Sequence, residues 1–84
     1  MSKAQNVDIK LKFPLNDGGQ VLDKLSMRRP KVRDMLSGAQ AGGSDAEAEV
    51  RLFAGLCDIT PELVEGMDLL DYQALQDAYK GFLS

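Results

Sequence analysis

Positions 28–33 hold the densest group of side chains that could do chemistry, because four of these six residues carry a positive charge. The four are Arg28, Arg29, Lys31 and Arg33. Such a group can bind the phosphates of a nucleic acid or pair with carboxylates of its own chain. A pI of about 4.7, the absence of tryptophan and the lack of aromatic residues within 28–33 favour the second interpretation. We expect Arg28 or Arg29 to pair with an acidic side chain, with Asp34 as one candidate, and to hold the turn at Pro30 into the next helix.

Catalysis and metal binding have few residues available to them. The sequence contains no histidine and one cysteine, which removes histidine-based acid–base catalysis and the common zinc ligand sets. Cys57 lies on the apolar stripe of a predicted helix without an obvious base beside it, which is typical of a structural thiol. The ten acidic residues of positions 34–84 fit a solvated face better than a pair of catalytic carboxylates. We therefore expect a protein-binding module that is not an enzyme and has no catalytic site, cofactor or metal.

Charge is divided unevenly along the chain. Residues 1–33 carry eight cations and three acids, a net charge of +5, whereas residues 34–84 carry two cations and ten acids, a net charge of −8. The two values sum to the net charge of −3 of the whole sequence. Two halves of opposite charge can attract each other or a partner.

The N-terminal part of the chain is predicted to form a β-hairpin over residues 6–27. Apolar and polar residues alternate on either side of a glycine-containing turn at 16–19, with a loop of about six residues, and Pro14 is expected to end the first strand. Residues 20–27 are also compatible with a short helix. The alternation places these residues on the apolar face: Val7, Ile9, Leu11 and Phe13 in the first strand, and Val21, Leu25 and Met27 in the second.

The remainder of the chain is predicted to be helical. A short helix over 31–36 is followed by a glycine-rich segment at 37–43 that we expect to be a flexible loop. Three N-cap signals then follow: Ser44 with Glu47 as a capping box, Thr60 before Pro61, and Asp68. The helices are expected to contribute these residues to the core: Val50, Phe53, Leu56, Leu75, Tyr79 and Phe82.

A single small α+β domain follows from this pattern, with an N-terminal β-hairpin and a bundle of three to four short helices. Its expected parts are a flexible N-terminus at 1–5, the hairpin at 6–27, the loop at 37–43 and a helical part at 44–84. Eighty-four residues leave room for one domain. The sequence has no apolar signal-peptide core and no stretch near the ~18–20 apolar residues that a membrane span needs, so we expect a cytoplasmic protein.

The order of these features resembles the phage tail assembly chaperone family that includes the gene E product of temperate myophages and its Mu-like prophage counterparts. The resemblance covers about residues 9–83 and is carried by LKFPL at 11–15, SMRRPKVRDML at 26–36, LFAGLCDITPELVEGMDLLDYQALQ at 52–76 and GFL at 81–83. The positions that match the family pattern are Arg28, Arg29, Pro30, Asp34, Gly55, Leu56, Thr60, Pro61, Glu62, Asp68, Asp71 and Tyr72.

This resemblance implies a non-enzymatic role in phage morphogenesis. Such proteins coat the long helical tape measure protein in the infected cell, keep it soluble until the tail tube polymerises around it, and are absent from the finished virion. The partner implied is an amphipathic helical segment of the tape measure protein. A longer form of the chain made by ribosomal frameshifting is a second candidate partner, whereas nucleic acid and membrane are not expected.

Several apolar residues are more than a small core needs, and part of this surplus is expected to form the partner-binding surface. The surplus comprises Leu52, Leu69, Leu70 and Leu83. The residues proposed for partner binding are Arg28, Arg29, Leu69, Leu70 and Tyr72, while Pro30 and Asp34 form a structural corner. The alternative function is a small phage or bacterial DNA-binding regulator that uses the basic corner at 28–33.

Overall fold

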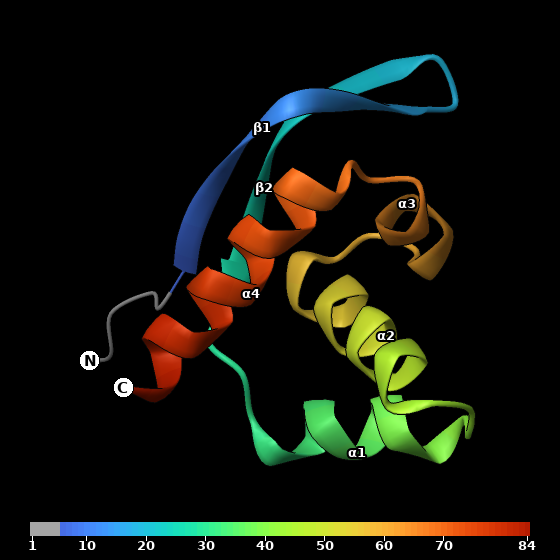
Figure 1. Ribbon diagram of the computed structural model, residues 1–84, viewed down its shortest axis with the longest axis vertical. Helices are drawn as coiled ribbons and strands as arrows, with labels where there is room; N and C mark the ends of the chain where they lie inside the picture. Colours follow the sequence, from blue (N-terminus) through green and yellow to red (C-terminus); the bar gives the residue numbers. More distant parts are fainter. Residues whose placement is uncertain (1–5) are drawn as a thin grey trace.

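A computed structural model describes residues 6–84 as a two-stranded hairpin packed against four helices (Figure 1). The elements are β1 (Asn6–Asp17), β2 (Gln20–Arg28), α1 (Val32–Gln40), α2 (Asp45–Cys57), α3 (Pro61–Glu65) and α4 (Leu69–Leu83). The hairpin lies along α4, and α1 runs beneath α2 at the opposite end of the molecule (Figure 1). This arrangement confirms the predicted α+β class and the single small domain. The expectation for residues 1–5 lies outside the described residues.

The first strand of the hairpin is longer and the turn is tighter than the sequence predicted. β1 and β2 are antiparallel and are joined by Gly18 and Gly19, whose φ angles are +59° and +90°. Glycine adopts these left-handed angles without a steric penalty, which allows a two-residue turn in place of the expected six-residue loop. The prediction that Pro14 ends the strand was also wrong, because β1 continues to Asp17.

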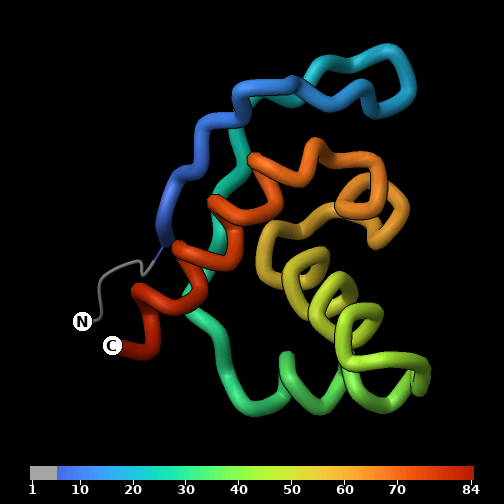
Figure 2. The backbone as a smooth tube through the Cα atoms, in the orientation of Figure 1, coloured from blue at the N-terminus to red at the C-terminus, as the bar shows by residue number. Residues whose placement is uncertain are grey.

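An irregularity in the register explains how β1 accommodates Pro14. Lys10 pairs with Lys24 and Leu15 pairs with Leu22, so four residues of β1 at 11–14 stand opposite one residue of β2. A proline is tolerated in such a segment because its missing N–H is not needed by the ladder. The backbone of the hairpin bends in this region, as the tube in Figure 2 shows.

The same irregularity changes which side chains face the core. Beyond it Leu15 is buried and Leu22 is half-buried, whereas Phe13 and Val21 are exposed. Both had been predicted to lie on the apolar face, and the extra residues in β1 are the reason that they do not. Val7, the second residue of β1, is also exposed at the open end of the hairpin.

Asp71 of α4 holds the irregular part of β1 in place. Its carboxylate accepts hydrogen bonds from the backbone N–H groups of Lys12 at 2.9 Å and Phe13 at 3.0 Å. The residue is 2 % exposed, and it is the one buried charged residue among those the structure describes. A buried carboxylate needs such partners, and the irregular strand in turn has N–H groups that β2 does not pair. This side chain therefore ties the hairpin to α4.

The core lies between the inner face of the hairpin and helices α2 and α4. The hairpin and helices contribute these buried apolar residues: Ile9, Leu11, Leu15, Leu25, Met27, Phe53, Leu56, Cys57 and Leu75. Phe53 is fully buried, and its ring centroid lies 5.5 Å from those of both Tyr72 and Tyr79. Phe53, Leu56 and Leu75 thus occupy the core as predicted, whereas Val50, Tyr79, Phe82 and the surplus residue Leu52 are half-buried.

Helix α1 extends through Gln40, which corrects the predicted boundary between a helix at 31–36 and a loop from 37 to 43. The reason is a close contact with α2 at Gly38, which is buried. A Cβ atom at this position would lie 2.8 Å from the carbonyl oxygen of Ala48. Arg51 of α2 also donates hydrogen bonds to the carbonyl oxygens of Gly38, at 2.9 Å, and Gly42. Gly38 is therefore a packing residue of α1.

All three predicted N-caps are present. Ser44 Oγ accepts a hydrogen bond from the N–H of Glu47 at 3.1 Å, and the Glu47 carboxylate accepts one from the N–H of Ser44 at 2.8 Å. Thr60 caps α3 through Leu63 N–H, and Asp68 caps α4 through Leu70 N–H. These bonds satisfy backbone donors that have no partner inside the helix, and so they set where α2, α3 and α4 begin.

Candidate partner-binding surface

An apolar hollow lies where α2, α3 and α4 meet, and we call it the α2–α4 groove. It has a volume of about 340 Å³. Its lining residues are Ala46, Glu49, Val50, Val64, Glu65, Met67, Leu69, Tyr72 and Gln76. Two of the residues predicted to bind a partner, Leu69 and Tyr72, are therefore brought together here. Leu69 is the first residue of α4 and is 70 % exposed, so its side chain is available to a partner.

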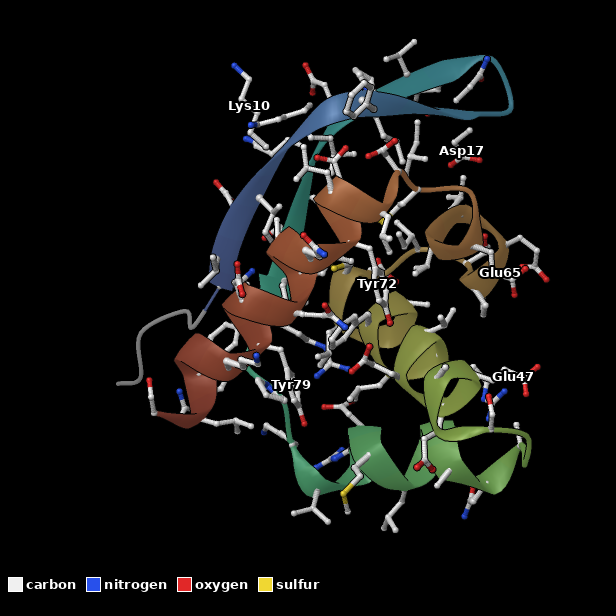
Figure 3. All side chains as sticks on the ribbon, viewed as in Figure 1. Lys10, Asp17, Glu47, Glu65, Tyr72 and Tyr79 are labelled. Atoms are coloured by element: carbon white, nitrogen blue, oxygen red, sulfur yellow. The ribbon has the colours of Figure 1, made fainter. Side chains whose placement is uncertain are left out.

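The wall between α2 and α4 is held by hydrogen bonds to Glu49. Its Oε1 accepts from the Tyr72 hydroxyl at 2.5 Å and from Gln76 Nε2 at 3.0 Å. Burial raises the pKa of Tyr72, and the hydrogen bond to the Glu49 carboxylate raises it further. The phenol therefore stays protonated and continues to donate at physiological pH. Figure 3 shows Tyr72 projecting from α4 towards α2.

The charge of the groove is negative. Glu49 and Glu65 are in its lining, and the lining contains no lysine or arginine. Figure 3 shows Glu65 on the outer side of α3. An apolar hollow with acidic edges fits an apolar segment that carries cations beside its stripe.

The basic corner is engaged within the protein itself. Arg28 donates two hydrogen bonds to Asp34, at 2.9 and 2.6 Å, and the Asp34 carboxylate also accepts from the N–H of Lys31 at 2.8 Å. The bond to Arg28 lowers the pKa of Asp34, and the bond to Asp34 raises that of Arg28. The structure therefore contains the expected ion pair, and it lies at the start of α1 beside Pro30.

The second arginine of the corner has a different partner. The guanidinium of Arg29 lies over the ring of Phe82, 5.9 Å from its centroid, which is the geometry of a cation–π contact. Arg28 and Arg29 thus contact α1 and the end of α4, and neither lines the α2–α4 groove. Leu70 is also outside this groove, in a hollow that it shares with Lys10, Lys12 and Asp71. The five residues predicted for one partner site are therefore spread over three places.

Comparison of the sequence with protein-family models finds one known group. The model for "Phage tail assembly chaperone proteins, E, or 41 or 14" matches residues 8–84, nearly the whole chain. The chain belongs to the phage tail assembly chaperone family. The comparisons with curated proteins and with solved structures gave no match. The family description names a chaperone and not a class of enzyme.

Two searches cover residues 6–84 of this chaperone family member, one for clusters of metal-ligating side chains and one for membrane-spanning helices. These residues contain no group of three or more cysteine, aspartate or glutamate side chains placed to hold a metal ion. No helix in the same range is both long enough and apolar enough to cross a membrane. Burial raises the pKa of the Cys57 thiol to about 11, which agrees with the structural role predicted for it.

Much of the groove in this chaperone family member was not found from the sequence. Glu49 and Gln76 were not singled out, although they join α2 to α4, and Val64 and Met67 were not considered as lining residues. Glu49 lies four residues before Phe53 and so on the same face of α2, which offered a weak signal. The contact between Glu49 and Gln76 joins residues 27 positions apart, which local patterns do not reveal.

Proposed function

We propose that this protein binds an amphipathic helical segment of the phage tape measure protein in the α2–α4 groove. It keeps that protein soluble in the host cytoplasm until the tail tube polymerises, and it is not retained in the virion. The observation that carries the proposal is the family match over residues 8–84. The role is non-enzymatic, and a frameshifted longer form of the chain is a second partner.

The physical basis is the aggregation hazard of an exposed amphipathic helix. Before the tail tube polymerises, a long helical protein presents an apolar stripe to water, and such stripes associate with one another. A groove lined by Val50, Val64, Met67 and Leu69 offers a reversible alternative contact for a short length of that stripe. Because the groove is small, each copy of the chaperone binds weakly. Many copies can then cover the tape measure protein and be displaced when the tube assembles.

The acidic edges of the groove specify the segment further. Glu49 and Glu65 favour a stripe flanked by lysine or arginine, although most of the binding free energy comes from apolar burial. Affinity should consequently change little between low and physiological salt concentrations.

The test is co-expression with the tape measure protein of the same phage, followed by pull-down and by measurement of the soluble fraction. Leu69→Lys places a cation in the groove and should abolish both capture and solubilisation. Val21→Lys is the matched control, because Val21 is 66 % exposed at the far end of the hairpin. Equal capture by the two variants would rule out the groove, and failure of the wild-type protein to solubilise its partner would rule out the function.

DNA binding by the basic corner provides the contrasting outcome. A regulator that contacts several phosphates should lose affinity for duplex DNA by orders of magnitude over the same range of salt. The engagement of Arg28 with Asp34 and of Arg29 with Phe82 argues against this alternative. Tight, salt-sensitive binding to DNA with no binding to the tape measure protein would replace the chaperone proposal by the regulator.

A further inference from the structure

Helix α1 buries its less apolar side and presents its apolar stripe to solvent. Its apolar residues follow the helical spacing i, i+3, i+4, i+7, and we call them the α1 stripe: Val32, Met35, Leu36 and Ala39. Val32 is 70 % exposed, Met35 55 % and Leu36 51 %, and Ala39 is exposed as well. The contact with α2 is made instead through Gly38. An amphipathic surface helix ordinarily turns its apolar stripe to the core, so this stripe lacks the partner that its pattern predicts.

The stripe continues onto the end of α4. A hollow of about 210 Å³ joins the two helices and is lined by Pro30, Lys31, Val32, Met35, Tyr79 and Leu83. Leu83 is itself exposed. The site is separate from the α2–α4 groove, with which it shares no lining residue.

Cationic residues lie in or near this surface. Lys31 is in the lining, Arg33 follows on α1, and Lys80 lies three residues before Leu83 on α4 and so on the same side of that helix. Arg29 lies over Phe82 nearby. The one acid of α1, Asp34, is paired with Arg28, and the lining of the hollow includes no carboxylate. The surface is therefore cationic although the whole chain has a net charge of −3.

We propose that the α1 stripe and the adjoining end of α4 bind an acidic amphipathic helix of a partner protein. The partner's apolar stripe would cover Val32, Met35 and Leu83, and carboxylates beside that stripe would meet Lys31, Arg33 and Lys80. Charge complementarity selects this occupant, because the α2–α4 groove has the opposite sign and favours a basic segment. Nucleic acid fits less well, since the centre of the surface is apolar and the cations lie at its edges. The proposal does not depend on the tape measure assignment of the other groove.

Two synthetic peptides of about 20 residues, long enough to form helix on binding, test the proposal. They share one leucine stripe and carry either glutamate or lysine at the flanking positions. Nuclear magnetic resonance of the ¹⁵N-labelled protein should show that the glutamate peptide shifts the amide signals of residues 32–39 and 79–83. The lysine peptide should bind there at least about tenfold more weakly, a difference of about 1.4 kcal/mol.

Three variants test whether the glutamate peptide binds at this surface and not elsewhere on the protein. Met35→Glu should weaken binding of the glutamate peptide about tenfold or more, since it removes apolar contact and adds a like charge at an exposed position. Val21→Glu, a matched exposed site, and Leu69→Lys, in the other groove, should leave that affinity unchanged. Circular dichroism of each variant is the control that checks that it is folded.

Three results would overturn the proposal. One is equal binding of the two peptides, and another is a glutamate-peptide affinity that Met35→Glu does not alter. The third is evidence that the surface has another occupant. Sedimentation would show self-association that Met35→Glu abolishes, or duplex DNA would displace the peptide. The first two results would remove the site, and the third would reassign it to a second copy of the chain or to nucleic acid.

Discussion

Asp71 is a buried charged residue whose hydrogen bonds join the hairpin to α4. Its buried carboxylate accepts hydrogen bonds from two backbone N–H groups of β1, where the regular pairing with β2 is interrupted. Hydrogen bonds to a charged group contribute about 1.5–3 kcal/mol each, and a buried donor left without a partner is costly. The family resemblance includes this position, and the structure gives it a physical role in joining the hairpin to α4.

Asp71→Ala should lower the free energy of unfolding by about 2–4 kcal/mol, because it leaves the N–H groups of Lys12 and Phe13 without their acceptor. Urea denaturation followed by circular dichroism measures this loss. Asp77→Ala, an exposed acid on the same helix, is the control and should change stability by no more than about 0.5 kcal/mol. Equal losses for the two variants would show that the contact with β1 is unimportant.

The Arg28–Asp34 pair should give a small contribution to stability that depends on pH. Arg28→Ala should cost about 1 kcal/mol or less at pH 7, because the arginine side chain is half exposed. The bond to Arg28 lowers the pKa of Asp34, so the paired carboxylate stabilises the fold above the unfolded pKa of 3.8. That contribution is lost as the pH falls through the lower folded pKa.

Denaturation of wild-type protein and Arg28→Ala across this acidic range measures the difference, which should shrink as Asp34 becomes protonated. A difference that grows on acidification would contradict the pairing. If Arg28→Ala abolishes partner binding without any loss of stability, the corner is a binding site and not a structural element.

At the scale of the elements, α1 shows how a glycine can be part of a helix–helix contact. Gly38 brings the backbone of α1 against α2, and Arg51 donates hydrogen bonds to the carbonyl oxygen of Gly38 in the last turn of α1 and to that of Gly42 beyond the helix. Arg51 thus satisfies groups that a helix C-terminus leaves unpaired. This contact orients α1 so that its apolar stripe faces solvent.

Alanine substitution should have opposite effects at two helical glycines. Gly55 of α2 has nothing within 4 Å of a new Cβ, so Gly55→Ala should stabilise by about 0.5–1 kcal/mol through helix propensity. Gly38→Ala should destabilise by about 1–3 kcal/mol, since its Cβ would lie 2.8 Å from the Ala48 carbonyl oxygen. Thermal denaturation of the two variants measures these changes in stability. If both substitutions stabilised the protein, α1 and α2 would not be in close contact at Gly38.

The whole molecule depends on a small core centred on Phe53. The ring is fully buried and contacts Tyr72 and Tyr79, and Met27 and Leu75 are fully buried in the same cluster. A domain of this size has a free energy of unfolding near the low end of the usual range of about 5–15 kcal/mol. One large cavity is therefore enough to remove most of its stability.

Phe53→Ala should cost about 3–5 kcal/mol and leave the protein largely unfolded at 37 °C. Phe53→Leu, which keeps most of the apolar volume, should cost less and serves as the folded control. Melting followed by circular dichroism measures both. A Phe53→Ala variant that melts within a few degrees of wild type would show that Phe53 is not central to the core.

The sequence by itself determined the features that depend on neighbours along the chain. Ser44, Thr60 and Asp68 were identified as N-caps because a capping side chain bonds an N–H only two or three residues away. The Arg28–Asp34 pair spans six residues, and helical spacing alone placed Phe53 and Leu75 in the core. The family resemblance rested on the same local motifs and their order, and the family match confirmed it.

Only the tertiary structure decided the features that depend on contacts between distant segments. The carboxylate of Asp71 meets β1 across 59 residues, and the irregular register there turns Phe13 and Val21 outward against their local alternation. Gly38 is part of a helix because α2 lies against it, although its own neighbours suggested a loop. The α2–α4 groove and the exposed α1 stripe exist for the same reason: which face of a helix is buried is settled by the helix or strand that packs against it, and the periodicity of one segment does not identify that neighbour.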